Sequence, residues 1–382
     1  MNVDFGQLFE KLLLHSLVAH QKGDVSPPLR YIILANPCAG GWTIPKRRAA
    51  NLKALEEAAA FAEKNNPRRD AAVVSIPALD EADALCENGV LNTKKPGVSY
   101  RLTQRLLDII KVDDSSVFYL IICAGGDGTS LEVQSAIYDA AEHLLPARIL
   151  DRLAVLRLPF GTGNDGADGF TLDTALRLLT HPSYIEKNPA LILRTAKETT
   201  VSGAKGPFTA FNILSVGLDA FVTHMTNKMK GKLPGDSYKL WVDVASLLYD
   251  KIYHVGYLDI KAFKDNSTEP FQTLHEKALL LAMGASGRRC YGSQNWILPD
   301  ARNVCIVKQM PLLKKVKLKG QFKEGTHSNL PISILFNCDR VEFMGDNPIL
   351  AQMDGETVLL QKDDFPASIS LSEKIIPVLH TT

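Results

Sequence analysis

Regular alternation of apolar runs with helical segments between residues 31 and 161 is the sequence feature that most restricts the fold. The apolar runs are YIILANP (31–37), AAVVSIP (71–77), VFYLIICAGG (117–126) and RLAVLRLPFG (152–161). The segments between them have helical spacing of apolar residues and cover 49–65, 99–111 and 129–145. Parallel strands need long crossover connections, so this order is typical of a parallel sheet with helices on its faces.

The pattern changes after about residue 170, where short β-rich runs separated by turn residues dominate. Such runs are typical of an antiparallel sandwich or barrel-like domain. A chain of 382 residues is also too long for most single cores. We therefore predict an α/β protein with an N-terminal three-layer parallel-sheet domain and a C-terminal β-sandwich-like domain. The expected limits are a helical extension over 1–28, the α/β domain over 29–168, rejoined by 365–382, and the β-rich domain over 169–364.

Composition excludes several classes of protein. The net charge is +1, so no overall field points to a nucleic-acid partner. The six cysteines show no CxxC or paired spacing, which argues against a zinc site or a disulfide framework. No apolar run reaches about 18 residues, and the first helical segment, 1–24, contains Asp4 and Glu10, so we expect neither a membrane span nor a signal peptide. These features predict a cytoplasmic protein that is at most peripheral at the inner membrane face.

Three of the predicted strands run into glycine-rich turns: CAGG (38–41), GGDGT (125–129) and FGTGND (160–165). Ligands of open parallel sheets bind beyond the carboxyl ends of the strands. Glycine lets backbone N–H groups approach an anion closely, and a helix N-terminus adds a favourable dipole. Each turn alone has an ordinary structural explanation, such as a helix cap for Asp127. Three of them on one sheet edge predict a polyphosphate site.

Other nucleotide and hydrolase motifs are missing from the sequence. GxxxxGK[ST] does not occur, and GxGxxG does not follow the first strand. Neither GxSxG nor HExxH is present. The sequence therefore argues against a P-loop enzyme, a Rossmann dehydrogenase, an α/β-hydrolase and a zinc protease.

The glycine-rich turns and several later motifs together resemble the soluble lipid kinases, the diacylglycerol kinase and sphingosine kinase-like enzymes that are distantly related to NAD kinases. The central motif is GGDGT at 125–129, followed by Glu132 and Val133. The accompanying motifs, in chain order, are Asn36-Pro37 with Gly40-Gly41, PFGTGND (159–165), Asn212-Ile213 with GLDA (217–220), Tyr291-Gly292 with Pro299 and Ala301, and QMDGE (352–356).

The resemblance implies a phosphoryl-transfer site in a nucleotide cleft between the two domains, with ATP and Mg²⁺ as cofactors. Asp127 would hold the Mg²⁺ ion. Asp354 would take the proton from an acceptor hydroxyl, and Glu356 would support it or the metal. The implied nucleotide-binding residues are Asn36, Pro37, Gly40, Gly125, Gly126, Gly128, Thr129, Glu132, Gly161, Thr162, Asn164 and Asp165. The segment 76–85 is a further candidate for contact with the ribose or adenine.

The pair Asp354 and Glu356 has two interpretations. If the segment is extended, Asp354 and Glu356 are two residues apart in a strand and their side chains face the same side. Asp354-Gly355 between apolar runs is also a common hairpin turn.

The function that the resemblance implies is an ATP-dependent lipid kinase acting on diacylglycerol or on a sphingoid or isoprenoid alcohol. Two alternatives stay open. One is an NAD kinase-like enzyme, which shares GGDGT. The other is a catalytically impaired lipid-binding protein, because the family's Asp-Asp-Gly after Ala301 is absent and Gly166-Ala167-Asp168 replaces a usual basic residue.

A lipid kinase must meet a membrane, and two segments are candidates for that contact. The N-terminal helix is amphipathic, and KKVKLKGQFK (314–323), read as a strand, places Lys315, Lys317 and Lys319 on one face. Lysines on an edge strand also prevent aggregation, and a terminal helix usually packs on its own core. We expect ATP and a lipid as partners and no nucleic acid, and we leave a homodimer open.

Overall fold

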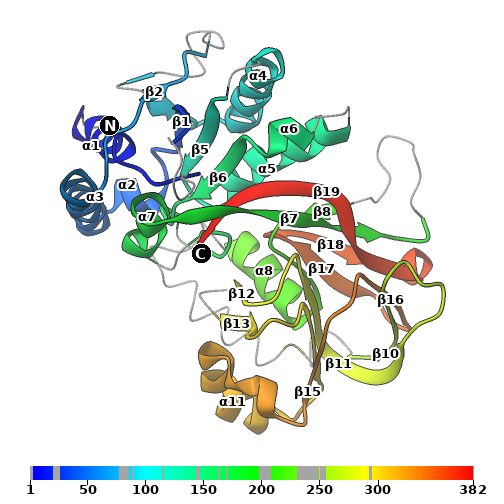
Figure 1. The fold of residues 1–382 in the computed structure, drawn as a ribbon. Coiled ribbons are helices and arrows are strands. Elements are labelled where there is room, and N and C mark those ends of the chain that lie inside the picture. Colours follow the sequence, from blue (N-terminus) through cyan, green and yellow to red (C-terminus); the bar gives the residue numbers. More distant parts are fainter. Residues whose placement is uncertain are drawn as a thin grey trace. The chain divides into compact units, whose positions relative to one another are not determined.

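The computed structural model describes residues 3–19, 26–76, 86–87, 90–113, 116–142, 147–161, 164–168, 171–197, 208–229, 249, 255–291 and 295–381. The chain divides into two compact units, Met1–Asn188 with Lys374–Thr382, and Pro189–Glu373. It passes from one unit to the other within two long strands, β7 (Ser183–Arg194) and β19 (Ala367–Thr381) (Figure 1). The limits expected from composition, after residues 168 and 364, precede these crossings.

The first unit is built on a parallel sheet that contains β1 (Leu29–Ala35). One edge of β1 pairs with β5 (Phe118–Ala124), and β5 pairs with β6 (Leu153–Arg157). The other edge of β1 pairs with β2 (Ala71–Val73) and β4 (Val90–Asn92), and Val155 of β6 pairs with Val378 of β19. All these pairs are parallel; the short β3 (Cys86–Glu87) is antiparallel to β4. The predicted parallel α/β fold is confirmed.

Helices cover this sheet in two groups (Figure 1). The first group packs with β1 and β5 in one apolar core and consists of α1 (Val3–Leu13), α2 (Gly40–Thr43), α3 (Pro45–Asn65) and α7 (Leu172–Thr180). The second group contains α4 (Val98–Val112) and α5 (Asp127–Glu142), which pack on each other, and the short α6 (Ala147–Leu150). Every residue of β5 is buried, as expected for a central parallel strand with helices on both faces.

The N-terminal helix is part of the core of the first unit. Phe5, Phe9, Leu12 and Leu13 of α1 are buried in the same cluster as β1 and β5. The helix ends at Leu13, so the expected single helix over 1–24 is too long. Its apolar face is covered by protein, so the alternative that a terminal helix packs on its own core holds for α1.

The second unit is antiparallel and β-rich, as predicted. Its central strand, β11 (Gln272–Gly284), pairs with β10 (Tyr257–Phe263) through its first half and with β14 (Val304–Lys308) and β9 (Ile213–Gly217) through its second half. The other strands are β8 (Phe208–Ala210), β12 (Arg289–Tyr291), β13 (Asn295–Leu298), β15 (Ser333–Phe336), β16 (Arg340–Gly345), β17 (Ile349–Met353) and β18 (Glu356–Leu360). The helices are α8 (Leu218–Met229), α11 (Leu312–Glu324) and the 3₁₀ turns η1 (Thr326–Asn329) and η2 (Lys362–Asp364). The predicted helix near 236–252 lies almost wholly outside the described residues.

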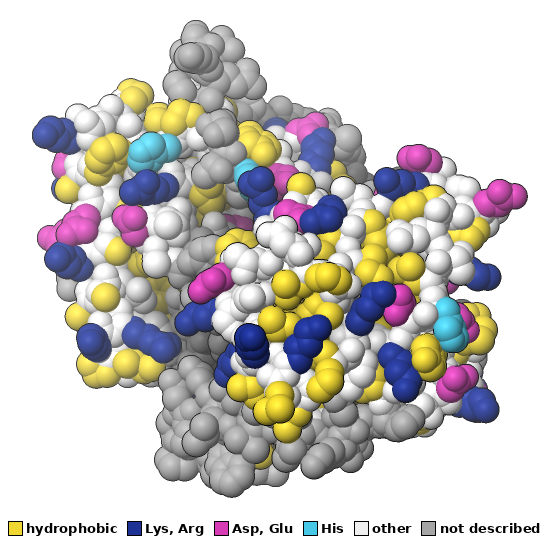
Figure 2. Space-filling view, turned by 90° about the horizontal axis from the view of Figure 1, so that it is seen from below, with side chains coloured by type: hydrophobic (Ala, Val, Ile, Leu, Met, Phe, Trp, Pro, Cys, Tyr) yellow, Lys and Arg dark blue, Asp and Glu magenta, His cyan; other side chains and the backbone are white. Residues whose placement is uncertain are grey.

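The segment expected to be a lysine-bearing strand, 314–323, is instead part of helix α11. Its alternating lysines suggested a two-residue period, but Leu318 and Phe322, four residues apart, pack into the core of the second unit. α11 lies on the side of the molecule seen in Figure 2. Across the described residues, no helix is long and apolar enough to span a membrane.

Replacement of Phe9 tests whether α1 is structural. Phe9 is fully buried, so Phe9→Ala should lower the free energy of unfolding of the first unit by about 3–5 kcal/mol. The matched control is Phe61→Ala on α3, whose side chain is 44% exposed. Urea unfolding followed by circular dichroism measures both, and equal, small effects of the two variants would contradict a core role for α1.

Candidate phosphate-binding site

The three glycine-rich turns meet at one edge of the sheet in the first unit. They follow β1, β5 and β6, which are adjacent and parallel, so their carboxyl ends lie together. The backbone N–H of Asn36 donates to the carbonyl of Ala124 at 3.3 Å, which ties the first turn to the second strand. The N–H of Gly41 donates to the carbonyl of Phe160 at 2.7 Å, which ties the first turn to the third.

Gly126 and Gly161 let the second and third turns touch backbone to backbone. A Cβ atom on Gly161 would lie 2.7 Å from Cα of Gly126, a distance that real Cβ atoms do not show. Any side chain at Gly161 would therefore push the two turns apart. The close approach leaves the backbone at the start of α5 uncovered by side chains of these two residues, which is how glycine-rich turns present N–H groups to phosphate.

Asp127 is the first residue of α5, and its carboxylate holds the third turn. Its Oδ1 atom accepts a hydrogen bond from the N–H of Gly166 at 3.1 Å. It makes no hydrogen bond to the N–H groups of its own helix among the described contacts, so it is not a simple cap. A half-buried carboxylate at a helix N-terminus, with Oδ2 not bonded to any described residue, can also coordinate a cation.

Asn164 supplies a second oxygen near this position. It adopts a left-handed backbone conformation with φ of 57°, and its Oδ1 atom is buried without a hydrogen-bond partner among the described residues. That oxygen lies 2.9 Å from the place a Gly161 Cβ would occupy. A buried acceptor without a donor is unfavourable, and a cation or a ligand donor would satisfy it.

The site fits Mg²⁺ only as part of a metal–phosphate complex. No group of three or more His, Cys, Asp or Glu side chains in the described residues could hold a metal by itself. Mg²⁺ commonly takes one or two carboxylates and completes its shell with phosphate oxygens and water. Asp127 and Asn164 are the oxygen-bearing side chains here that fit such a complex.

Some of the other predicted nucleotide-binding residues make hydrogen bonds within their own turn. Oδ1 of Asn36 accepts a hydrogen bond from the N–H of Cys38 at 3.0 Å, which is the contact of an Asx-turn. Thr129 is buried, and its N–H donates to the Gly126 carbonyl at 3.0 Å. Asn36, Pro37, Gly40 and Asp165 are half-buried, Gly125 is buried and Gly128 is exposed. Thr162 and most of 76–85 lie outside the described residues.

Glu132 is engaged away from the turns. Its two carboxylate oxygens accept hydrogen bonds from the N–H groups of Gly97 at 2.7 Å and Ser99 at 3.1 Å. These groups belong to the N-terminus of α4, where Gly97 has no side chain to cap the helix. The carboxylate therefore fastens α4 to α5, a role that the motif around Glu132 does not reveal.

A buried ion pair that the sequence analysis did not identify closes the third turn. Asp168 contacts the guanidinium of Arg157 through Nε at 2.9 Å and through Nη2, and it accepts the backbone N–H of Arg157 at 2.6 Å. The two side chains are 3% and 5% exposed. Removing one partner of such a pair leaves a buried charge, which costs about 3–5 kcal/mol. Asp168 thus fixes both ends of the loop between β6 and α7 that carries Asn164.

Aromatic rings pack against the glycine-rich turns on the side of the apolar core. Trp42 stacks on Phe160 with ring centroids 4.6 Å apart, and Phe5 of α1 meets Trp42 edge-on at 4.4 Å. The indole N–H of Trp42 donates to the Ala124 carbonyl at 3.0 Å. The first and third turns, the end of β5 and the N-terminal helix are therefore packed as one body.

In the second unit, Asp354 and Gly355 form the two-residue turn of the β17–β18 hairpin. Met353 pairs with Glu356, and the φ angles of Asp354 and Gly355 are 46° and 108°. Positive φ at both positions is typical of a hairpin turn with Asp-Gly. Of the two interpretations, the structure therefore supports the hairpin turn and not the extended segment with both side chains on one side.

The Asp354 carboxylate binds three successive backbone N–H groups. The donors are Phe211, Asn212 at 3.1 Å and Ile213 at 2.9 Å. Glu356 is exposed, and its carboxylate has no hydrogen bond to a described residue. Asp354 thus anchors the hairpin to the start of β9, whereas the Glu356 side chain is accessible.

A buried polar cluster stands beside this hairpin. Asp219, in the first turn of α8, accepts hydrogen bonds from Ser215 Oγ at 2.6 Å and Gln352 Nε2 at 3.2 Å, and Gln352 Oε1 accepts the N–H of Gly355. Burial raises the pKa of Asp219 to about 6, and the two donors only partly oppose that effect. Both Asp219 and Gln352 lie in motifs of the sequence, but their contact with each other is visible only in the fold.

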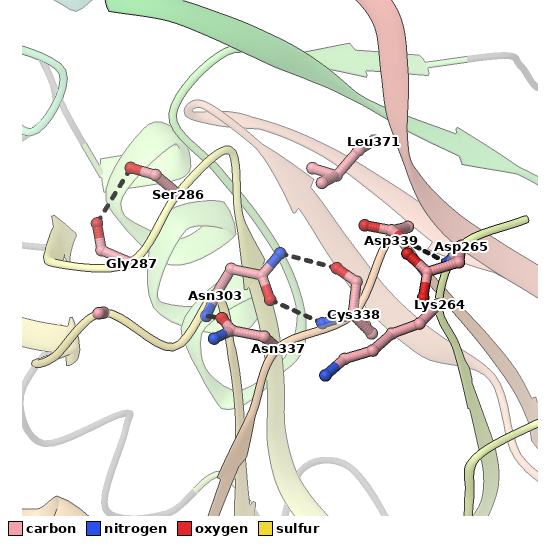
Figure 3. Close-up of a pocket in the computed structure, with 10 residues that line it drawn as sticks. Lys264, Asp265, Ser286, Gly287, Asn303, Asn337, Cys338, Asp339 and Leu371 are labelled. Atoms are coloured by element: carbon pink, nitrogen blue, oxygen red, sulfur yellow. Dashed lines mark hydrogen bonds between the residues drawn. The ribbon is translucent and has the colours of Figure 1, made fainter.

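A cavity of about 390 Å³ also lies in the second unit, and none of the glycine-rich turns lines it (Figure 3). Its polar groups largely satisfy one another. Asn303 exchanges two hydrogen bonds with the backbone of Cys338, and Asp339 accepts the N–H of Asp265 at 2.7 Å. Lys264, Ser286 and Leu371 are among its other lining residues. The cavity therefore offers a ligand few groups that lack a partner.

The raised pKa of Asp219 predicts a pH-dependent stability. The folded state holds the proton up to about pH 6 and the unfolded chain only up to about 3.8. The stabilisation from protonated Asp219 is thus complete below the lower value and is lost as the pH rises through 6, by about 3 kcal/mol in total. Asp219→Asn removes this titration. The difference in free energy of unfolding, wild type minus variant, should fall between pH 4 and pH 7 in urea titrations, and a constant difference would contradict the assignment.

Comparison with known proteins is consistent with this geometry. Residues 82–187 match the family model of the diacylglycerol kinase catalytic domain. A crystal structure of a provisionally assigned diacylglycerol kinase from Bacillus anthracis strain Sterne has the same fold, with a TM-score of 0.51 and 16% identity over 93% of this chain and 97% of that one. A second structure of such a protein from the same organism gives 0.50 and 17% over the same shares. A search of curated protein sequences gave no match.

The matched region contains the second and third glycine-rich turns, with Asp127, Glu132 and Asn164, whereas Asn36 and Asp354 lie outside it. The predicted resemblance to the diacylglycerol kinase family is therefore confirmed for the catalytic-domain sequence over residues 82–187 and for the fold.

Proposed function

We propose that this protein is an ATP- and Mg²⁺-dependent kinase that transfers the γ-phosphoryl group to a hydroxyl group of a lipid. Diacylglycerol and sphingoid or isoprenoid alcohols are the proposed acceptors. A phosphotransferase of the kinase type is what the catalytic-domain match supports at a coarser level. The acceptor, the nucleotide and the metal are the parts that we propose.

The observation that carries the proposal is the contact between Gly126 and Gly161 beside Asp127. It brings two glycine turns and a helix N-terminus to one place, with a carboxylate and an orphaned amide oxygen next to them. Phosphoryl transfer relies on positioning and on neutralising charge, and these groups suit both purposes.

On the nucleotide side, backbone N–H groups at the start of α5 would bind the phosphates, aided by the helix dipole. The proposed binding residues come from all three glycine-rich turns. They are Asn36, Pro37 and Gly40 of the first turn, Gly125, Gly126, Gly128 and Thr129 of the second, and Gly161, Thr162, Asn164 and Asp165 of the third. Asp127 and the Asn164 oxygen would hold Mg²⁺, which neutralises charge on the phosphates when bound. Glu132 would act indirectly, by keeping α4 and α5 together.

On the acceptor side, the hydroxyl oxygen attacks phosphorus, the bond to ADP breaks, and the hydroxyl proton passes to a carboxylate. Asp354 and Glu356 are the proposed carboxylates. Proton uptake by Asp354 would weaken its bonds to three backbone amides, whereas Glu356 is exposed. We therefore propose Glu356 as the proton acceptor and Asp354 as the residue that positions it.

Replacement of Asp127 tests the nucleotide side. Asp127→Asn should lower kcat by about a hundredfold or more, because a metal-linked charge at the transferring group is lost. The control is Asp173→Asn, which also removes a carboxylate from the first turn of a helix, α7, but lies at an exposed position. The assay uses labelled ATP with Mg²⁺ and, separately, diacylglycerol, a sphingoid base, an isoprenoid alcohol and NAD.

A labelled lipid that disappears with Asp127→Asn supports the proposal. Label on NAD would make the protein an NAD kinase-like enzyme. No product with any acceptor, while the protein still binds lipid, would favour the binding protein without turnover.

The two acceptor-side carboxylates can be separated by stability. Glu356→Gln should lower kcat and leave the melting temperature unchanged, since this side chain is exposed. Asp354→Asn should lower both, because it replaces one of the two accepting oxygens with an NH2 group that faces backbone N–H donors, which loosens the hairpin. Full activity of Glu356→Gln would exclude it as the proton acceptor, and an inactive but fully stable Asp354→Asn would return that role to Asp354.

A further inference from the structure

Helix α11 exposes an unusual number of large apolar side chains. Leu313 is 84% exposed, Val316 is 53% exposed and Leu312 is 41% exposed. They are consecutive or three residues apart, so they form one patch over the first turns of the helix. Single exposed leucines are common, but a contiguous group on one surface helix often marks an interaction site.

The patch faces away from the core that holds the helix. Leu318 and Phe322 are the apolar residues of α11 that pack inward, and the helix lies against β13 and η1. Leu313 and Gly320 are seven residues apart, about two helical turns, and lie on the opposite side. A Cβ atom on Gly320 would meet no atom within 4 Å, so that side is open.

Lysines flank the apolar patch. Lys314, Lys317 and Lys323 are exposed, and the only acidic residue of the helix is Glu324, at its last position. On the face shown in Figure 2, hydrophobic side chains gather in the central part of the view with Lys and Arg side chains among and beside them. The lysine stems can extend along an apolar phase while their charges stay in water.

We propose that α11 docks this protein onto the surface of an anionic lipid bilayer. An apolar centre with cationic flanks is the pattern of helices that lie in the membrane interface. Leu312, Leu313 and Val316 would enter the boundary between headgroups and acyl chains, and the lysines would contact lipid phosphates. The lack of acidic residues before Glu324 favours an anionic surface over a protein partner with mixed charge. Docking does not depend on phosphoryl transfer, so it can be measured without nucleotide.

The test is co-sedimentation of the full-length protein with sucrose-loaded vesicles, either of phosphatidylcholine alone or of equal parts of phosphatidylcholine and phosphatidylserine. The wild type should bind the mixed vesicles much more strongly. Lys314→Gln with Lys317→Gln should weaken that binding by roughly 25-fold, at about fivefold for each lysine near the surface. Leu313→Gln should weaken it roughly tenfold, through the lost burial of one apolar side chain.

Each variant has a matched control. Lys53→Gln with Lys64→Gln removes the same charge from exposed positions of α3, and Val112→Gln removes an 82% exposed side chain at the end of α4. Neither control should change binding. Circular dichroism should show the same melting temperature for Leu313→Gln as for the wild type.

Three outcomes would overturn the proposal. They are no binding of the wild type to mixed vesicles, equal binding to both kinds of vesicle, and loss of binding in the controls to the same extent as in the α11 variants. A change of oligomeric state in Leu313→Gln without any effect on vesicle binding would instead assign the patch to contact between copies of the chain.

Discussion

The close contact of three turns at one sheet edge is the constraint on which the candidate site depends. It requires glycine at 161, where a Cβ atom would lie 2.7 Å from the Cα of Gly126. It also requires the parallel register of β1, β5 and β6, which brings their carboxyl ends together. The Trp42–Phe160 stack and Phe5 of α1 then fix the turns from the core side. The N-terminal helix, distant in sequence from GGDGT, is thus part of the support of the site.

Carboxylates close together in the sequence of this region do different physical work. Asp127 accepts a hydrogen bond from the third turn through one oxygen, and its other oxygen has no described partner, whereas both oxygens of Glu132 accept hydrogen bonds from the N-terminus of α4. Asp168 is buried against Arg157 and holds the loop that presents Asn164. A rigid frame of this kind holds the Asn164 oxygen near Asp127, and such preorganisation favours binding of a charged group.

In the second unit, side-chain hydrogen bonds likewise hold the β17–β18 hairpin in place. Asp354 is held by three backbone amides, and Gln352 connects Gly355 to Ser215 and Asp219. The hairpin is therefore joined to both β9 and α8, so its motif and the GLDA segment are in contact in the fold. A carboxylate with so many structural partners is better suited to position a neighbour than to exchange protons itself.

Much of the fold could be predicted from the sequence, because hydrophobic periodicity and glycine turns are local signals. The strands β1, β5 and β6 and the helices α3, α4 and α5 follow from such signals, whereas the candidate role of Asp127 comes from the resemblance of its motif to the lipid kinases. The structure alone decided four other points: that 314–323 is a helix, that Asp354 anchors its hairpin to the start of β9, that Glu132 caps α4, and that Asp168 pairs with Arg157. Each of these depends on a partner that the local pattern does not name. Leu318 and Phe322 make α11 a helix because a core lies beneath them, and a carboxylate becomes a cap, an anchor or a metal ligand according to which donors the fold brings within reach.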